Sequence, residues 1–302
     1  MSATSEASSD RRDPAPRPSP AVPPPAPPSH TAWLRAADRV PIAAAYEPGP
    51  GPGGPAVVVA HGFTGALERP AIRRAAAVFA QRAGVVTFSF RGHGGSGGRS
   101  TVGDREVLDL AAAVAWARSL GHGRVATVGF SMGGSVVLRH GALYRGPAHG
   151  DGRGRGGRKG AGAAAGAYAD AVVSVSSPAR WYYRGTAPMR RLHWIVERRA
   201  GRAVSRLALH TRVHHRRWNP EPLSPTAAVP LIAPVPLLVV HGTRDGYFPL
   251  DHPRALAAAA AAPGGAELWL EEGFGHAENA AGDELLRRIA AWVAEAVSGR
   301  SS

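Results

Sequence analysis

Ser131 lies between two glycines in the segment Gly129–Gly133, directly after the apolar run Val125–Val128. A serine on a tight turn from a strand into a helix adopts a strained backbone conformation, so the residues two positions away must have almost no side chain. The strain exposes the hydroxyl, as a nucleophile requires. The segment Gly94–Gly98 repeats this spacing around Ser96, so the spacing alone does not choose between the two serines.

A serine hydroxyl is a weak nucleophile at neutral pH and needs a general base, which a carboxylate must in turn orient. Asp245 follows the apolar run Leu237–Val240, and His276 follows the run Glu267–Leu270. Both residues therefore stand just beyond predicted strands. The pattern predicts that His276 takes the proton of Ser131 and that Asp245 orients the histidine. Three carboxylates near the same end of the predicted sheet are alternatives for the acid: Asp251, Glu271 and Glu272.

Such a reaction also needs two backbone N–H groups directed at the negative oxygen of a tetrahedral intermediate, an arrangement called an oxyanion hole. Met132 opens the predicted helix after Ser131, where the helix dipole adds positive potential. The second donor should come from the loop after the apolar run Ala56–Val59. We expect this donor to be the N–H of Phe63.

Metal and thiol chemistry have little support in the sequence. The chain has no cysteine, which excludes disulfides, thiolate metal sites and a cysteine nucleophile. His210, His214 and His215 have a spacing that could bind a metal on one helix face, but no carboxylate accompanies them. We therefore expect no metal and no cofactor. Three further histidines adjoin glycine turns, where a hydrogen-bonded structural role is expected: His61, His93 and His241.

Short apolar runs alternate with helical stretches along most of the chain, after a β-hairpin predicted over Thr31–Glu47. Continuous apolar runs of this length are typical of a parallel sheet that is covered on both faces. The sequence thus predicts an α/β fold with a mostly parallel sheet of about eight strands and helices on both faces. The predicted strands are Ala56–Val59, Val85–Phe90, Val125–Val128, Ala171–Val175, Leu237–Val240 and Glu267–Leu270. The predicted helices are Arg69–Ala83, Val102–Leu120, Met132–Tyr144, His252–Ala262 and Asn279–Val297.

Four segments define the expected domain organisation. Residues 1–30 are rich in Pro, Ser and Ala and are predicted to be a disordered tail. Residues 31–302 form one catalytic domain, interrupted by a low-complexity Gly/Arg loop at 146–167. Residues 178–234 contain many aromatic side chains and helical spacing around Met189–Ala208, so we expect a small helical cap. The cap candidates for substrate contact are Trp181, Tyr182 and Trp194.

The net charge of +14 is concentrated in two segments. Residues 184–217 contain ten arginines against one glutamate, and residues 151–160 contain four basic residues against one aspartate. No nucleic-acid-binding motif accompanies this charge, so we expect no nucleic-acid partner. The cap arginines suit solvated helix faces or, on an amphipathic helix, weak association with an anionic membrane surface. No signal-peptide or membrane-spanning run occurs, and we expect a cytoplasmic protein.

Five motifs in order resemble those of the α/β-hydrolase fold family, and the resemblance spans nearly everything from Thr31 to Val297 except the two insertions. It implies that Ser131, Asp245 and His276 form a catalytic triad and that the RGHG loop is a structural turn, which excludes Ser96 as the nucleophile. Family members often carry Asp where Ser89 stands, and this departure affects loop packing more than chemistry. The motifs are HGF at 61–63, RGHGGS at 91–96, GFSMGG at 129–134, HGTRD at 241–245 and GFGH at 273–276.

The resemblance implies a serine hydrolase similar to esterases and lipases, acting on a small-molecule carboxylic ester through an acyl-enzyme. Hydrolysis of a thioester, an amide or a peptide bond at the same site is the alternative reaction. A non-catalytic binding protein of the same fold is the alternative from another class.

Overall fold

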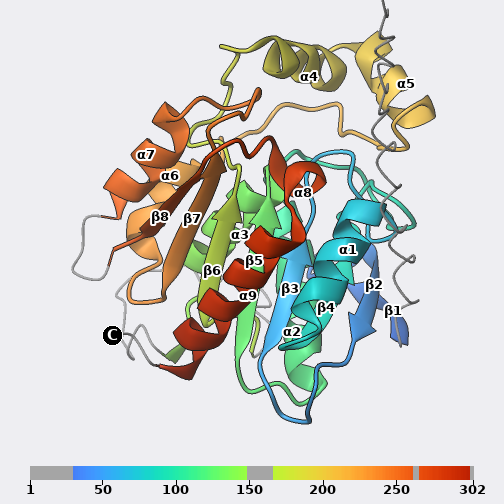
Figure 1. Cartoon of the computed structure of the whole chain (residues 1–302). Helices are drawn as coiled ribbons and strands as arrows, with labels where there is room; N and C mark the ends of the chain where they lie inside the picture. The colour runs from blue at the N-terminus through green and yellow to red at the C-terminus, as the bar shows by residue number, and fades with distance from the viewer. Residues whose placement is uncertain (1–29, 148–165, 261–264, 300–302) are drawn as a thin grey trace, which may run out of the picture.

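Eight strands form one sheet in the computed structural model, which describes residues 30–147, 166–260 and 265–299 (Figure 1). The strand order is β1-β2-β4-β3-β5-β6-β7-β8; β1 and β2 run antiparallel to their neighbours, and all the other pairs are parallel. This confirms the predicted hairpin and the mostly parallel sheet. The strands are β1 (His30–Arg35), β2 (Pro41–Glu47), β3 (Ala56–Ala60), β4 (Gly84–Phe88), β5 (Val125–Phe130), β6 (Ala171–Val175), β7 (Leu237–Gly242) and β8 (Glu267–Glu271).

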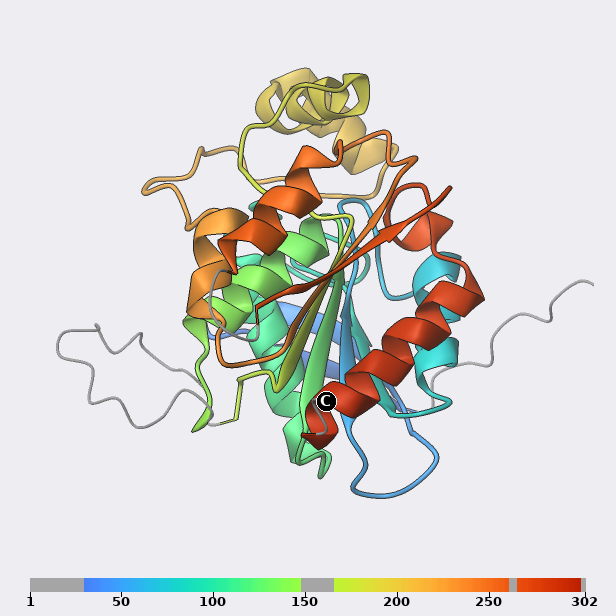
Figure 2. The ribbon, with the colours of Figure 1, turned by 60° about the vertical axis from the view of Figure 1, so that its left-hand side comes forward.

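Helices cover both faces of the sheet, as predicted (Figures 1 and 2). One face carries α1 (Pro70–Phe79), α8 (Ala277–Ala280) and α9 (Asp283–Ser298). The other face carries α2 (Glu106–Ser119), α3 (Met132–Leu143), α6 (Pro225–Ala228), the short 3₁₀ helix η2 (Val229–Leu231) and α7 (Asp251–Ala259).

The central strands are buried on both sides because their residues alternate between two hydrophobic cores. In β3, Val57 and Val59 pack in the core that contains α1 and α9. Val58, from the same strand, packs in the core that contains α2 and α3. A continuous apolar run therefore suits this strand, whereas a strand with one exposed face would alternate apolar and polar residues.

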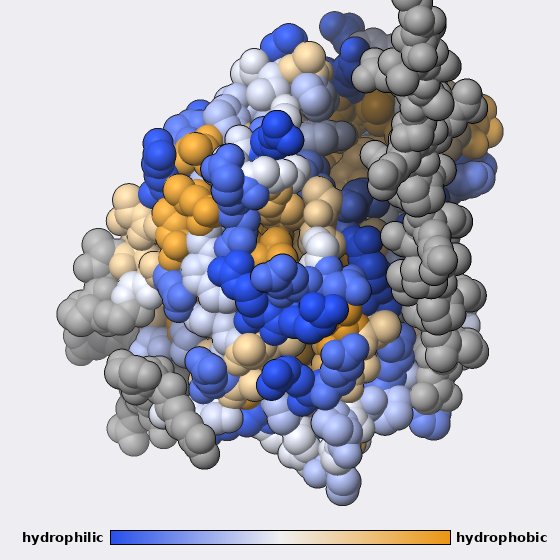
Figure 3. Space-filling view, viewed as in Figure 1, coloured by the Kyte–Doolittle hydropathy of each residue, from blue (hydrophilic) through white to orange (hydrophobic). Residues whose placement is uncertain are grey.

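The helical stretch predicted around Met189–Ala208 forms two helices, α4 (Ala187–Glu197) and α5 (Arg199–Leu207), above the carboxyl ends of the parallel strands (Figure 1). Arg198 separates them with an extended backbone at φ −92° and ψ 143°. We use the name cap helices for this pair. Figure 3 shows mostly hydrophilic residues over the cap helices, with apolar side chains exposed at the end formed by α5.

The rest of the predicted cap segment has two parts. Residues 208–224 return from the cap helices without regular structure, and α6 and η2 then pack against α3 in the body of the protein. The predicted tail and the low-complexity loop lie largely outside the described residues, although β1 already begins at His30. No helix among the described residues is long and apolar enough to cross a membrane.

Candidate active site

The turn from β5 into α3 has the geometry that the glycine spacing predicts. Ser131 adopts φ 51° and ψ −112°, and its N–H donates to the carbonyl of Val175 at 2.8 Å. A side chain at Gly129 would overlap the backbone of Gly133, and one at Gly133 would overlap the carbonyl of Ala60. Both glycines are therefore required for the turn to close. A non-glycine residue at positive φ costs about 1–3 kcal/mol, which the surrounding backbone contacts must offset.

His276 connects Ser131 to Asp245. Its Nε2 lies 3.0 Å from the Ser131 Oγ, and its Nδ1 lies 2.8 Å from an oxygen of Asp245. These residues are 145 and 31 positions apart from the histidine in sequence. The fold therefore brings together the three residues that the sequence nominated as nucleophile, base and acid.

The Asp245 carboxylate is fully buried, and its partners keep it ionised. Burial raises its pKa, but the hydrogen bond and charge of His276 and the Tyr247 N–H outweigh this effect, so the pKa lies below the usual value. One carboxylate oxygen accepts the N–H groups of Tyr247 and Phe248 at 2.8 and 3.1 Å. Since an ionised carboxylate only accepts hydrogen bonds, the Nδ1 of His276 must carry the proton. Its Nε2 is then free to accept the Ser131 hydroxyl.

The His276 ring is held by aromatic contacts as well as by Asp245. Tyr247 stacks on it with ring centroids 4.0 Å apart, and Phe248 approaches it edge-on at 5.7 Å. His241 donates from Nε2 to the Phe248 carbonyl at 2.8 Å, a structural role as expected. The segment after β7 thus supplies both the acid and one wall around the base.

The loop that carries Phe63 passes directly over Ser131. A Cβ on Gly62 would lie 3.3 Å from the Ser131 Cβ. Phe63 and Met132 line the same pocket as Ser131. His61 holds the start of this loop, because its Nδ1 lies 2.7 Å from the Gly62 carbonyl and its Nε2 accepts the Phe90 N–H at 3.0 Å.

Glu278 is a site residue that the sequence analysis did not identify. Its side chain is buried, and its Oε1 accepts the Gly62 N–H at 3.0 Å. Because Glu278 stands two residues after His276, it joins the loop of the histidine to the loop of Phe63. Its position after a histidine at the start of α8 gives no local pattern that would reveal this contact.

Three of the alternatives to Ser131 and Asp245 have other partners: Ser96, Asp251 and Glu271. The buried Ser96 hydroxyl donates to the Ser89 carbonyl at 2.5 Å and accepts the Ala43 N–H at 2.9 Å, so it anchors a turn. The Ser89 hydroxyl accepts the Leu67 N–H at 3.0 Å, which holds the loop that follows Phe63. Asp251 pairs with Arg180, and Glu271 pairs with Arg288.

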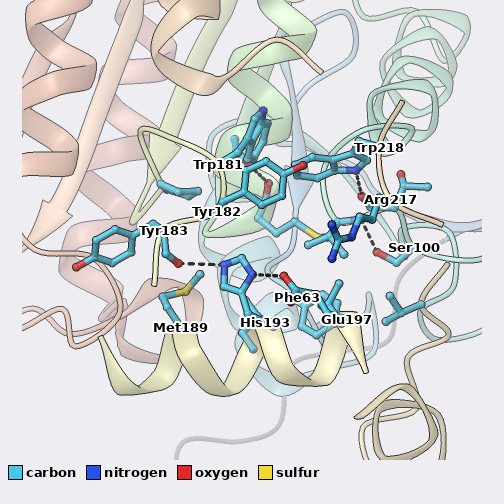
Figure 4. Close-up of a pocket in the computed structure, with 18 of the residues that line it drawn as sticks. Phe63, Ser100, Trp181, Tyr182, Tyr183, Met189, His193, Glu197, Arg217 and Trp218 are labelled. Atoms are coloured by element: carbon cyan, nitrogen blue, oxygen red, sulfur yellow. Dashed lines mark hydrogen bonds and ion pairs between the residues drawn. The ribbon is translucent and has the colours of Figure 1, made fainter. Parts of the chain in front are cut away.

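A pocket of about 330 Å³ lies between Ser131 and the cap helices. The cap side of this pocket is one face of α4. The residues on this face are spaced three to four positions apart and include Met189, His193 and Glu197 (Figure 4). Trp181 and Tyr182 line the pocket as expected. The structure does not bring Trp194 to it, because Trp194 lies off the pocket-facing stripe of α4 and is 48% exposed.

Trp218 lines the pocket and was not among the residues expected there. Its ring contacts those of Trp181 and Tyr182, with centroids 5.0 and 5.5 Å away. The Trp218 indole N–H donates to the Thr101 carbonyl at 2.7 Å, which fixes the ring against the body of the protein (Figure 4).

The three histidines considered for a metal do not form a ligand set. They follow the end of α5, so they are not on one helix face, and His214 and His215 stack on each other with centroids 5.0 Å apart. Within the part of the chain that the structure describes, no three His, Cys, Asp or Glu side chains gather closely enough to hold a metal.

Comparisons with known proteins agree with this architecture. Residues 55–149 match the family model of the α/β hydrolase fold. An esterase of Pyrococcus furiosus is similar over 89% of this chain and 92% of its own, with 19% identity and a TM-score of 0.65. A Xanthomonas campestris serine hydrolase described as having no lid is similar over 90% and 94%, with 18% identity and a TM-score of 0.52.

A serine hydrolase homologue from Coxiella burnetii is similar over 89% of this chain and 98% of its own, with 15% identity and a TM-score of 0.53. None of the curated protein sequences matches this chain. The family-model match covers the strands and the turn that carry Ser131, and the solved structures extend the likeness to the whole sheet. This chain is therefore a protein of the α/β-hydrolase fold.

Proposed function

We propose that this protein is a serine hydrolase that cleaves a carboxylic ester of a small molecule. The observation that carries the proposal is the contact of His276 with Ser131 at 3.0 Å and with Asp245 at 2.8 Å. A nucleophile, a base and an orienting acid within hydrogen-bond distance are the requirement for nucleophilic acyl transfer.

In the first half of the reaction, the Ser131 Oγ attacks the carbonyl carbon of the ester while the Nε2 of His276 accepts the hydroxyl proton. The carbonyl oxygen becomes negative, and the N–H groups of Phe63 and Met132 stabilise it. His276 then gives the proton to the leaving alcohol oxygen as the carbon–oxygen bond breaks. The acyl group stays on Ser131.

In the second half, water replaces the alcohol and His276 takes one of its protons. The resulting hydroxide attacks the acyl carbon, and the same two N–H groups stabilise the second tetrahedral intermediate. When this intermediate collapses, His276 returns the proton to the Ser131 Oγ and the carboxylic acid leaves. Asp245 remains ionised throughout and stabilises the histidine while it is positively charged.

The pocket supports an ester that carries an apolar or aromatic group. The Phe63 and Trp181 side chains line the space beside Ser131, and Met189 covers it from α4. The fold is shared with an esterase, and an ester substrate is compatible with it. No cofactor is part of the proposal, because proton transfer and charge stabilisation come from the protein itself.

A panel of 4-nitrophenyl esters with graded acyl length tests the proposal. We expect the wild type to release nitrophenol and the variant Ser131→Ala to lose at least about a thousandfold in kcat. Ser96→Ala is the matched control, because it changes the serine of the other glycine-flanked copy, and it should retain activity in proportion to the folded protein. Equal activity of Ser131→Ala and wild type would exclude the proposed mechanism.

A further inference from the structure

The pocket above Ser131 is rich in positive charge. Five arginines line it, against one carboxylate, that of Glu197. The arginines are Arg180, Arg184, Arg202, Arg216 and Arg217.

Three of these arginines already have partners. Arg180 pairs with Asp251 at 2.8 Å, and Arg184 pairs with Glu197 at 2.5 Å. Arg202 donates to the backbone carbonyls of Val196 and Glu197 at 3.2 and 2.8 Å. Arg202 joins α5 to the end of α4, and Arg184 and His193 together occupy the Glu197 carboxylate, the one carboxylate that lines the pocket.

Arg216 and Arg217 differ from the other three. Among residues 30–147, 166–260 and 265–299, neither guanidinium has an ion pair or a hydrogen bond, whereas Arg180, Arg184 and Arg202 each have at least one. Figure 4 shows the Arg217 side chain below Trp218, directed toward the middle of the pocket. Arg217 also lies close enough to Tyr182 to act on its pKa: burial and Glu221 raise this pKa, whereas Arg217 lowers it.

Arg217 therefore stands beside a fixed aromatic wall. Trp218 is held by the Thr101 carbonyl at 2.7 Å, and the Trp181 indole N–H donates to the Pro222 carbonyl at 2.9 Å. Such a wall positions an apolar segment of a ligand, while a guanidinium binds carboxylate, phosphate or sulfate oxygens through charge-assisted hydrogen bonds.

We propose that the substrate is an anionic ester: its reacting carbonyl lies at Ser131, its apolar part lies against Trp181 and Trp218, and Arg217 binds a carboxylate, phosphate or sulfate at its other end. The inference rests on the proposed function, because it assigns the substrate class of the same site. It makes Arg217 a specificity-determining residue that takes no part in proton transfer.

Two matched pairs of esters test this assignment and also locate the charge. For the acyl side, 4-nitrophenyl hydrogen adipate is compared with 4-nitrophenyl 6-oxoheptanoate, in which a methyl ketone replaces the carboxylate. For the alcohol side, the butyrate ester of 4-hydroxybenzoate is compared with 4-acetylphenyl butyrate. We expect the charged member of at least one pair to have a kcat/KM about tenfold or more above its neutral partner. High salt should reduce this preference.

The variant Arg217→Gln should lose most of the preference, because kcat/KM should fall far more for the charged member of a pair than for its neutral partner. Arg191→Gln is the matched control, because Arg191 is an exposed α4 arginine that does not line the pocket. It removes the same charge from the cap and should leave the preference intact. A preference that Arg217→Gln retains, or that both variants lose equally, would overturn the assignment.

The failure of this inference can be distinguished from failure of the proposed function. Hydrolysis of both members of each pair at equal rates by the wild type, abolished in Ser131→Ala, would reject the anionic substrate and keep the serine hydrolase. If no ester is hydrolysed, calorimetric binding of the same four compounds to Ser131→Ala still gives a result. Tighter binding of a charged member, lost on adding Arg217→Gln, would support the anion site, and equal binding would reject it.

Discussion

The carboxylate of Glu278 accepts the N–H of Gly62 at 3.0 Å, which joins the loop after the candidate base to the loop that carries one candidate oxyanion donor. The two residues are 216 positions apart, and both are buried beside Ser131. Arg74 on α1 also holds the segment after the base, because it donates to the carbonyls of Glu278 and Ala281. A shift of the loop that carries His276 would therefore also shift the loop that carries Phe63.

Glu278→Ala should slow the reaction without abolishing folding. The change leaves the Gly62 N–H without its acceptor, so the Phe63 N–H loses its fixed position, and a misplacement of about 1 Å can cost about a hundredfold. We expect kcat and kcat/KM to fall together by about tenfold to a hundredfold, because the oxyanion contact is made in the transition state. Glu278→Gln keeps an acceptor oxygen and should retain most activity. A rise in KM alone, with kcat unchanged, would contradict this positioning role.

Gly133→Ala should prevent the turn at Ser131 from closing. The added methyl group would overlap the Ala60 carbonyl, and the backbone of β3 cannot move without disrupting the sheet. We expect a loss of about 3 kcal/mol or more in the free energy of unfolding, together with loss of activity. Gly123→Ala is the control, since no atom lies within 4 Å of a Cβ there, and its effect should stay within about 0.5 kcal/mol. Urea denaturation of both variants measures the difference, and equal stability would argue against the steric requirement.

The fold could be predicted because its signals are local. The run Ala56–Val59 is apolar at every position, and a strand buried on both faces requires this. The turn at Ser131 could be predicted for the same reason. Gly129 must lack a side chain because the backbone of Gly133, four residues later, lies against it. In each case the physical cause and the sequence pattern occupy the same short segment.

The parts that the sequence analysis missed depend on contacts between distant segments. Glu278 has a function only because Gly62 is brought beside it by the fold. Trp218 reaches the pocket through residues 208–224, which have no regular structure and so no periodicity to interpret. Trp194 was expected in the pocket on its residue type alone, but the direction in which α4 faces the body decided otherwise.

Acid should destabilise the protein partly through His140. Burial lowers the pKa of this fully buried histidine from 6.5 to about 4. Between these two values the unfolded chain binds a proton that the folded protein does not, so stability that is present above pH 6.5 is lost as the pH falls toward 4. His140→Phe keeps a ring against Tyr144, which stacks on His140 with centroids 4.7 Å apart, and removes the titrating group.

The free energy of unfolding of the wild type should therefore fall relative to that of His140→Phe by about 1.4 kcal/mol per pH unit over this range. Urea denaturation at pH 7 and pH 5 measures the change for each protein. Parallel pH dependence of the two proteins would show that His140 does not titrate as described.

The outer surface of the cap helices should bind anionic membranes weakly. Trp194, Val204 and Leu207 are exposed at 48%, 44% and 76%, and exposed arginines surround them. A basic residue near an anionic lipid surface contributes about 1 kcal/mol. We expect sedimentation with phosphatidylserine-containing vesicles at low salt and release at high salt. Replacing Arg190, Arg191, Arg198, Arg199 and Arg206 with Gln should abolish binding; unchanged binding would rule out the cap helices as the contact.

The most direct test of the account is to treat the folded protein with a fluorophosphonate and to locate the adduct by peptide mass spectrometry. The 3.0 Å contact between His276 and Ser131 predicts one adduct, on Ser131, and none on Ser96 or in the Ser131→Ala variant. His276→Ala should label far more slowly, because the base that activates the hydroxyl is missing. An unlabelled Ser131 in folded wild-type protein, or an adduct on Ser96, would contradict the central claim.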